Sequence, residues 1–96
     1  MAITQLHIEN AIELAKDYNV NKLLLFGSAV TDPYNANDLD LAVEILDKAV
    51  FYDFAGMLEY ILNVPVDVVD LSIESPFTSH IKEIGKIIYD KSSNIN

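Results

Sequence analysis

The stretch FGSAVTDPYNANDLD, residues 26–40, joins two apolar runs and carries most of the groups in this chain that can do chemistry. Gly27 and Ser28 end the first run, and Asp38 and Asp40 open the second. If the second run is a strand, both aspartates face the same side, with their carboxylates about 6 to 7 Å apart. Two oxygen ligands beside a flexible turn predict a Mg²⁺ site next to a space for a phosphate group.

The patterns on either side of this stretch predict alternating helices and strands. Helical spacing of apolar residues, an N-cap at Asp47 and the pair Ser75-Pro76 mark the helices, and fully apolar runs mark the strands. The predicted elements are a helix over 3–18, a strand over 22–26, a brief helical turn over 27–30, a strand over 38–45, a helix over 48–62, a strand over 65–71 and a helix from 76 to about 90. This order predicts an α/β (α+β) fold, with a small mixed β-sheet of about three strands packed on helices.

The composition predicts a single domain over residues 1–96. Apolar residues make up 51% of the chain, which is enough for one small core. The absence of cysteine excludes disulfides and thiolate metal sites. No apolar run approaches the roughly 18 residues of a membrane span, and the first ten residues lack the features of a signal peptide. We therefore expect a cytoplasmic protein with no membrane association.

The charge balance limits the kinds of molecule that the protein can bind. Fifteen acidic residues oppose six basic ones, all of them lysine, so the formal net charge is −9. Direct nucleic-acid binding is disfavoured because no basic stripe is available to neutralise phosphates. A nucleotide would have to arrive with its metal ion, whereas a basic or apolar protein partner is easier to accommodate. Both homo- and hetero-oligomers are compatible with these residues.

Asp67 is a third carboxylate of interest, because it lies in an otherwise apolar predicted strand. Burying its charge is costly unless it is paired or bound to a cation, and the alternative is an edge strand with Asp67 facing water. If this strand lies beside the one that carries Asp38 and Asp40, three carboxylates converge. Three acidic groups around Mg²⁺ suit phosphoryl or nucleotidyl transfer. Asp70 faces the opposite side and is predicted to be structural.

Other metal sites are less well supported. A calcium loop of the EF-hand type counted from Asp32 needs glycine at its sixth position and glutamate at its twelfth, where this chain has Asn37 and Val43. His7 and His80 lie on different predicted helices without a ligand-spaced partner. We expect both to be partly exposed helix residues.

Three segments together are similar to a known family. The segments LFGS (25–28), DLDLAV (38–43) and VDVVDL (66–71) resemble the minimal nucleotidyltransferase (MNT) domain of the DNA polymerase β-like superfamily. The resemblance spans most of the chain, and the combination is far more specific than any one segment. It implies a nucleotidyltransferase-like fold with ATP and Mg²⁺ as ligands.

The resemblance also implies a role for each motif residue. In the family the Gly-Ser turn holds the triphosphate, which assigns nucleotide binding to Gly27 and Ser28. The D-x-D aspartates ligate the metal, which assigns this role to Asp38 and Asp40. Asp67 completes the triad, both as a metal ligand and as a catalytic group placed to help deprotonate the acceptor.

The small free-standing members of the family are similar to antitoxins that pair with HEPN-type toxins. The resemblance therefore implies a nucleotidyltransferase, specifically a protein adenylyltransferase, that moves AMP from ATP to a hydroxyl group on a partner protein. This chain has no arginine, and the turn continues as Ala29-Val30-Thr31-Asp32 in place of the arginine-containing stretch of many members. A second hypothesis thus stays open, in which an MNT-like module with little or no catalysis neutralises its partner by contact.

Overall fold

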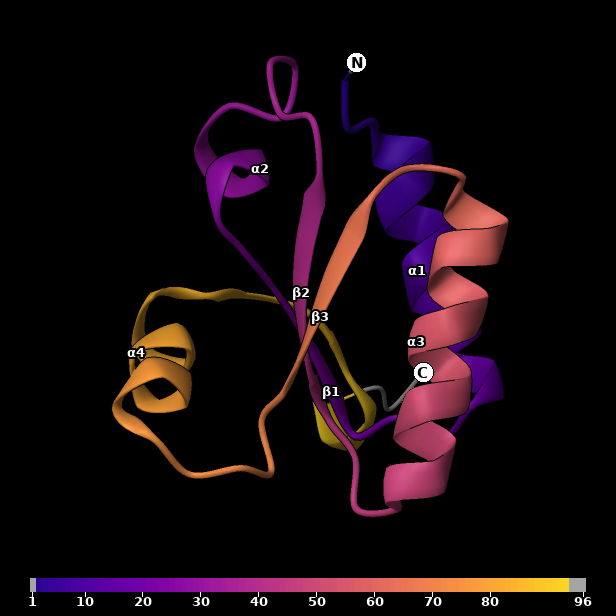
Figure 1. The fold of residues 1–96 in the computed structure, drawn as a ribbon, viewed down its shortest axis with the longest axis vertical. Coiled ribbons are helices and arrows are strands. Elements are labelled where there is room, and N and C mark those ends of the chain that lie inside the picture. Colours follow the sequence, from indigo (N-terminus) through magenta and orange to yellow (C-terminus); the bar gives the residue numbers. More distant parts are fainter. Residues whose placement is uncertain (1, 94–96) are drawn as a thin grey trace.

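The computed structural model describes residues 2–93, which form one four-stranded sheet with helices on both faces (Figure 1). None of the helices in this part of the chain has the length and apolar character to cross a bilayer. The elements, in chain order, are α1 (Gln5–Asp17), β1 (Lys22–Phe26), α2 (Ser28–Thr31), β2 (Leu39–Glu44), α3 (Lys48–Leu62), β3 (Val66–Asp70), α4 (Pro76–Ile84), β4 (Lys86–Asp90) and a 3₁₀ turn, η1 (Lys91–Ser93).

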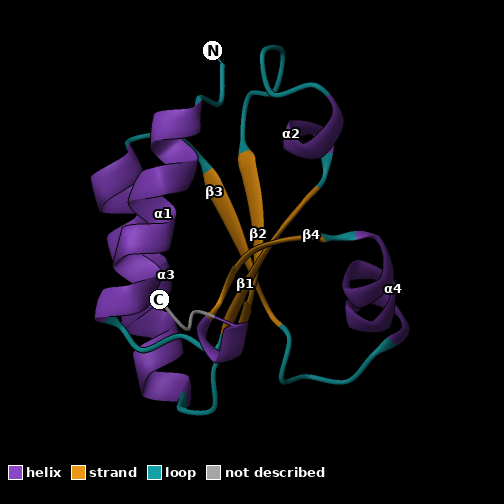
Figure 2. Ribbon diagram, turned by 180° about the vertical axis from the view of Figure 1, so that it is seen from behind, coloured by secondary structure: helices purple, strands orange, loops and turns teal. Residues whose placement is uncertain are grey.

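The strands lie in the order β3-β2-β1-β4. β1 pairs antiparallel with β2 and with β4, whereas β2 and β3 are parallel, with α3 as the crossover between them. Helices α1 and α3 cover one face of the sheet and α4 lies on the other (Figure 2). The short α2 lies near the end of the sheet where β1 stops and β2 begins (Figure 1). The mixed α/β fold predicted from the sequence is confirmed.

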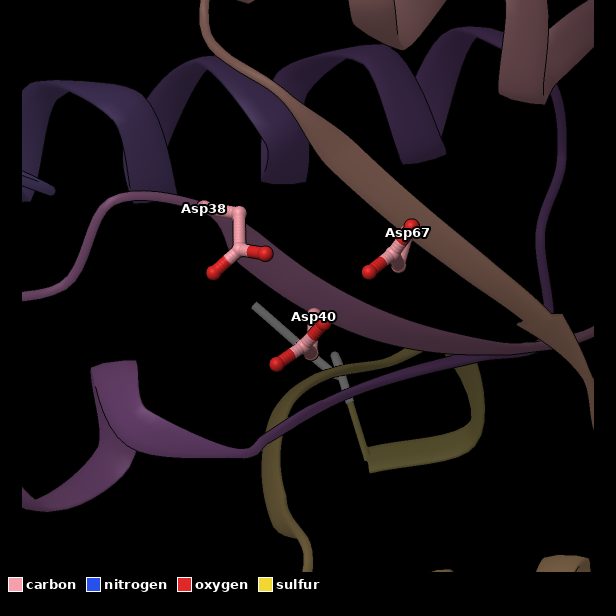
Figure 3. Close-up of side chains that lie close together, drawn as sticks. All are labelled: Asp38, Asp40 and Asp67. Atoms are coloured by element: carbon pink, nitrogen blue, oxygen red, sulfur yellow. The ribbon is translucent and has the colours of Figure 1, made fainter.

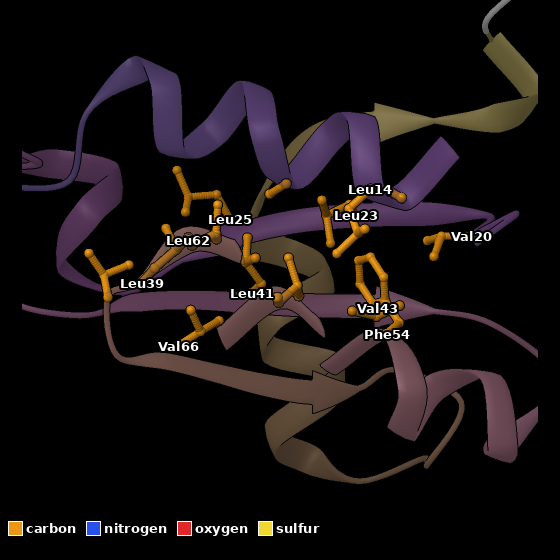
Figure 4. Close-up of a cluster of buried hydrophobic side chains, with 14 of the residues drawn as sticks. Leu14, Val20, Leu23, Leu25, Leu39, Leu41, Val43, Phe54, Leu62 and Val66 are labelled. Atoms are coloured by element: carbon orange, nitrogen blue, oxygen red, sulfur yellow. The ribbon is translucent and has the colours of Figure 1, made fainter. Parts of the chain in front are cut away.

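Strand alternation divides the core into two parts. Leu23, Leu25 and Val43 belong to the larger cluster, beneath α1 and α3 (Figure 4). Leu24 and Ala42 belong to a smaller cluster with residues of α4. Because successive strand residues face opposite sides, Asp40, two positions before Ala42, and Phe26, two positions after Leu24, lie on the α4 face as well. The functional site therefore lies on the less covered face of the sheet.

The predicted helix starts are confirmed by their caps. The Asp47 side chain accepts a hydrogen bond of 2.9 Å from the Ala49 backbone N–H at the start of α3. Ser75 accepts from the Thr78 N–H at 3.1 Å, in a capping box that begins α4 with a proline in the first turn. These side chains satisfy N–H groups that a helix leaves unpaired at its start.

The prediction of a final helix reaching Asp90 is wrong, and the sheet has four strands, one more than the roughly three predicted. The helix ends at Ile84, and Lys86–Asp90 form a fourth strand against β1. The apolar spacing in this segment fits a helix, but Gly85 adopts an extended conformation (φ −68°, ψ 150°) that breaks it. Strand pairing then satisfies backbone groups along the open edge of β1, and the segment is rich in β-branched and aromatic residues that suit a strand.

Asp70 is structural, as predicted, and it links β3 to the start of α3. Its carboxylate is buried and forms an ion pair with Lys48 Nζ at a distance of 2.9 Å. It also accepts hydrogen bonds from the Ser72 N–H at 2.9 Å and the Ser72 hydroxyl at 2.6 Å. Burial by itself raises the pKa of Asp70, but the hydrogen bonds from Ser72 and Lys48 outweigh it and hold the pKa below its ordinary value.

An Asp70→Asn substitution is expected to lower the free energy of unfolding by about 2 kcal/mol at pH 7, because it removes a buried, hydrogen-bonded charge. The folded-state pKa lies below the unfolded value, so this stabilisation is complete above the unfolded pKa and is lost as pH falls through the folded pKa. Urea unfolding of both proteins checks this, since their difference should shrink below about pH 4.

The matched control is Asp90→Asn. Asp90 accepts the same pair of hydrogen bonds from Ser92, at 2.9 Å and 2.7 Å, but in an exposed setting. It should cost clearly less stability than Asp70→Asn. Equal losses in the two variants would mean that the turn hydrogen bonds matter and the buried ion pair does not.

Candidate functional site

Three carboxylates converge at one end of the sheet, on the face opposite α1 and α3. Asp40 on β2 is the register partner of Asp67 on β3, and Asp38 comes just before β2. One oxygen from each of the three lies within 4.8 Å of the other two (Figure 3). β3 is an edge strand and Asp67 is exposed, so this carboxylate faces water and also joins the cluster. The predicted convergence of these residues is therefore present in the fold.

The electrostatics of the cluster favour a bound cation. Partial burial, the negative charge of Asp38 and a hydrogen bond that protonated Asp40 can donate to Asp67 together raise the pKa of Asp40 to about 6. The three groups thus resist carrying three negative charges at once. A divalent cation removes this repulsion, and carboxylate oxygens are the ligands that Mg²⁺ prefers. The donor set fits such an ion.

Gly27 lies directly against this cluster. Its φ of +78° and ψ of −160° belong to a region that only glycine adopts readily. A Cβ at this position would run into Asp40 Oδ2 and would lie 3.0 Å from Asp40 Cγ. Glycine is therefore required both by the backbone turn and by the space that the Asp40 carboxylate occupies.

Ser28 begins α2 directly beside the cluster. The Val30 N–H bonds back to Gly27 O at 3.2 Å, whereas the Ser28 and Ala29 N–H groups make no hydrogen bond among the described residues and stay available next to the carboxylates. Asp32 stands at the opposite end of α2, and its carboxylate accepts a 2.8 Å hydrogen bond from Asn35 Nδ2. The negative charge of Asp32 is therefore directed toward Asn35, away from the start of the turn.

Two features of this region were not predicted from the sequence. The contact between Gly27 and Asp40 follows from the pairing of Phe26 with Asp40 across β1 and β2. A hairpin alignment of the two apolar runs could have found it. The contact between Lys48 and Asp70 depends on how α3 returns over the sheet, and the sequence carries no local signal for that contact.

The two histidines do not belong to the cluster of carboxylates. His7 takes part in the N-terminal cap of α1, and His80 lies in α4, so each is on a different element from Asp38, Asp40 and Asp67.

A mixed sheet that brings a Gly-Ser turn and three carboxylates together has the architecture of a nucleotidyltransferase fold. Residues 9–94 match the family model described as polymerase beta, nucleotidyltransferase. This match covers most of the chain, and the protein belongs to that family. No curated protein sequence matches the chain.

Solved structures support an MNT-type member of the family. The chain is similar to a chain of the toxin–antitoxin complex MntA–HepT, with 26% identity, a TM-score of 0.68 and coverage of 93% of this chain and 74% of that one. It is 28% identical to a chain of a toxin–antitoxin structure with AMP-PNP, with a TM-score of 0.70 and coverage of 86% and 73%. A third match is in the complex of a tri-AMPylated Shewanella oneidensis HEPN toxin with its MNT antitoxin, with 28% identity, a TM-score of 0.65 and coverage of 92% and 73%.

Proposed function

We propose that this protein is a Mg²⁺-dependent nucleotidyltransferase that transfers AMP from ATP to a hydroxyl group of a partner protein. The partner we propose is a HEPN-type toxin, so that the protein acts as the antitoxin of a HEPN/MNT pair. The observation that carries the proposal is the convergence of Asp38, Asp40 and Asp67 within 4.8 Å, beside the Gly27-Ser28 turn. One similar structure holds a tri-AMPylated HEPN toxin with its MNT antitoxin, which supports the same chemistry here.

Each residue has a separate task in this proposal. Asp38 and Asp40 would hold Mg²⁺, with Asp67 completing the ligand set, and the bound ion would offset the negative charge of the triphosphate. Gly27 and Ser28 bring backbone close to the phosphates, because glycine leaves room and the turn has free N–H groups. Asp67, the exposed member on the edge strand, is the one that an incoming hydroxyl group from a second protein can reach.

The reaction is a substitution at the α-phosphorus of ATP. The acceptor hydroxyl oxygen forms a bond to this phosphorus, and the bond to the bridging oxygen of the β-phosphate breaks. Asp67 accepts the hydroxyl proton, and pyrophosphate leaves with the electron pair of the broken bond. The product is an AMP diester of the partner, which alters the charge and shape of its acceptor side chain.

A binding module that neutralises its partner by contact is the second candidate. The chain contains no arginine, so it lacks the bidentate phosphate clamp that arginine provides. A carboxylate directed at the turn would repel a triphosphate and so favour this alternative. The Asp32 carboxylate is instead hydrogen-bonded to Asn35, which weakens the alternative.

An isotope experiment separates the two candidates. The protein is incubated with Mg²⁺, a HEPN-type toxin encoded beside its gene, and ATP labelled on either the α- or the γ-phosphate. Label from the α-position should appear on the toxin, and label from the γ-position should appear only in pyrophosphate. Neutralisation without any label on the toxin would favour the binding module.

Mg²⁺ binding can be tested without catalysis. Millimolar Mg²⁺ at about ten times its Kd should raise the melting temperature by roughly 5 to 10 °C, since it binds only the folded protein. The Asp38→Asn/Asp40→Asn variant should show almost no rise in thermal unfolding followed by circular dichroism. An equal rise in both proteins would place the ion elsewhere.

A further inference from the structure

An aromatic pair continues the row of site residues across the sheet. Phe26 on β1 is the register partner of Asp40, which on its other side is paired with Asp67. Phe26 packs against the cluster on the α4 face, so all three residues face the same side of the sheet. The ring of Phe77, in the first turn of α4, meets Phe26 at a centroid distance of 6.2 Å and an interplanar angle of 81°.

Phe77 is not needed to fill the core on this face. Its residue surface is 57% exposed, whereas Leu24 and Ile81 in the same region are almost fully buried. It contacts Phe26 in an edge-to-face arrangement and leaves much of its surface open to solvent. An exposed aromatic ring next to a polar site offers a flat apolar surface that suits a planar ligand.

In the proposed reaction each part of ATP extends from the α-phosphorus in its own direction. The leaving pyrophosphate would lie toward Gly27 and Ser28, at the start of α2. The acceptor approaches from the β3 side, where Asp67 is exposed at the sheet edge. In an in-line displacement the attacking hydroxyl group and the leaving pyrophosphate lie on opposite sides of the α-phosphorus, so the nucleoside extends from the phosphorus in a third direction. The remaining side of the site is formed by β1 and the start of α4, where the two phenylalanines lie.

We propose that Phe77, supported by Phe26, is the platform on which the adenine base of ATP stacks. This inference rests on the proposed function and extends it from the triphosphate to the nucleoside. Phe77 is a positioning residue in this scheme, since it holds the base and does not touch the reacting atoms. Base–aromatic stacking tolerates different bases because each has a π-face, so GTP should compete with ATP for this platform.

A tryptophan reporter tests the stacking directly. The chain has no tryptophan, so Phe77→Trp introduces a single fluorophore at the platform. Mg²⁺–ATP should quench its fluorescence, and Mg²⁺–tripolyphosphate, which lacks a base, should not. The matched control is Tyr60→Trp, at an 82% exposed position of α3 on the opposite side of the sheet, whose fluorescence should not respond to either compound.

Binding constants complete the test. Phe77→Ala should weaken Mg²⁺–ATP binding about tenfold and leave Mg²⁺–tripolyphosphate binding unchanged, and Phe77→Tyr should restore the ATP affinity. The KM for ATP should rise in the alanine variant with little change in kcat.

The other outcomes overturn the proposal in distinguishable ways. If Phe77→Ala binds ATP as the wild type does, the platform is wrong and the proposed transfer of AMP stands. Equal weakening of ATP and tripolyphosphate binding would make the ring a structural support, which also contradicts stacking. If the wild type binds neither compound in the presence of Mg²⁺, the platform and the proposed function both fail.

Discussion

An Asp40→Asn substitution is expected to lower the rate of AMP transfer at least about 10³-fold, which corresponds to about 4 kcal/mol of lost transition-state stabilisation. Asp40 is the central carboxylate of the cluster, paired across the sheet with Asp67 and packed against Gly27. Asparagine keeps the size of the side chain but removes the charge that would hold the metal ion. Initial rates of label transfer from α-labelled ATP measure the loss.

The same substitution should make the metal-free protein more stable at pH 7. The pKa of Asp40 is raised to about 6, so folding favours its protonated form and its ionisation opposes folding as pH rises from about 4 to 6. Removing the charge should recover about 1 kcal/mol after allowance for solvent screening. A fall in both activity and stability would show that Asp40 has a structural role and would weaken its assignment to the metal site.

The matched control for this prediction is Asp32→Asn. Asp32 lies in the same segment, but its carboxylate is hydrogen-bonded to Asn35 at 2.8 Å. Its substitution should leave the transfer rate within about twofold of the wild type, because its side chain is bonded to Asn35 and its contact with the turn is a backbone hydrogen bond to Ser28 O that asparagine keeps. A large loss of transfer rate in the Asp32→Asn variant would show that the rate depends on the total negative charge of the segment and not on the position of Asp40.

Gly27→Ala is the second substitution with a large expected effect. It should lower the free energy of unfolding by about 2 to 3 kcal/mol, because the backbone at φ +78° disfavours any side chain and the new Cβ would displace the Asp40 carboxylate. Transfer of AMP should fall at least about 10²-fold, since misplacing a catalytic group by about 1 Å costs that much. Urea unfolding and initial-rate assays measure the two effects.

Gly56→Ala is the control for the loss of a glycine. Gly56 lies inside α3, and a Cβ there would have no heavy atom within 4 Å. Alanine is the better helix former, so this variant should be more stable by about 0.5 to 1 kcal/mol and fully active. If Gly27→Ala behaved like Gly56→Ala, the close approach of the turn to Asp40 would be irrelevant to the site.

The candidate site could be predicted from sequence because its parts follow local rules. The twofold period of a strand predicts Asp38 and Asp40 on one side, and the two carboxylates do lie together although β2 begins only at Leu39. A Gly-Ser pair after an apolar run predicts a turn that leaves room for phosphate. The neighbour relation of Asp40 and Asp67 is different, because it depends on β3 adding in parallel beside β2. The position of β3 beside β2 is set by the packing of the whole sheet. From the sequence, the convergence of the three carboxylates could be predicted only for the case in which these two strands are neighbours.

The C-terminal segment shows where the local rules were insufficient. Apolar residues there fit a helical period, and the open edge of β1 that captures Lys86–Asp90 lies about sixty residues away in sequence. Gly85 was the local signal for the break, since glycine within a helical pattern lowers its stability. Tertiary pairing therefore outweighed the spacing, and the sheet gained its fourth strand.

We propose that the three carboxylates drive transfer of AMP to a partner protein, and the intact mass of a HEPN-type toxin after incubation with Mg²⁺–ATP and this protein shows whether they do. With the wild type, the toxin should gain the mass of one or more AMP groups and lose its activity. With the Asp38→Asn/Asp40→Asn variant, it should gain no mass and stay active. A toxin neutralised equally by both proteins, with no added mass, would rule out AMP transfer as the means of neutralisation.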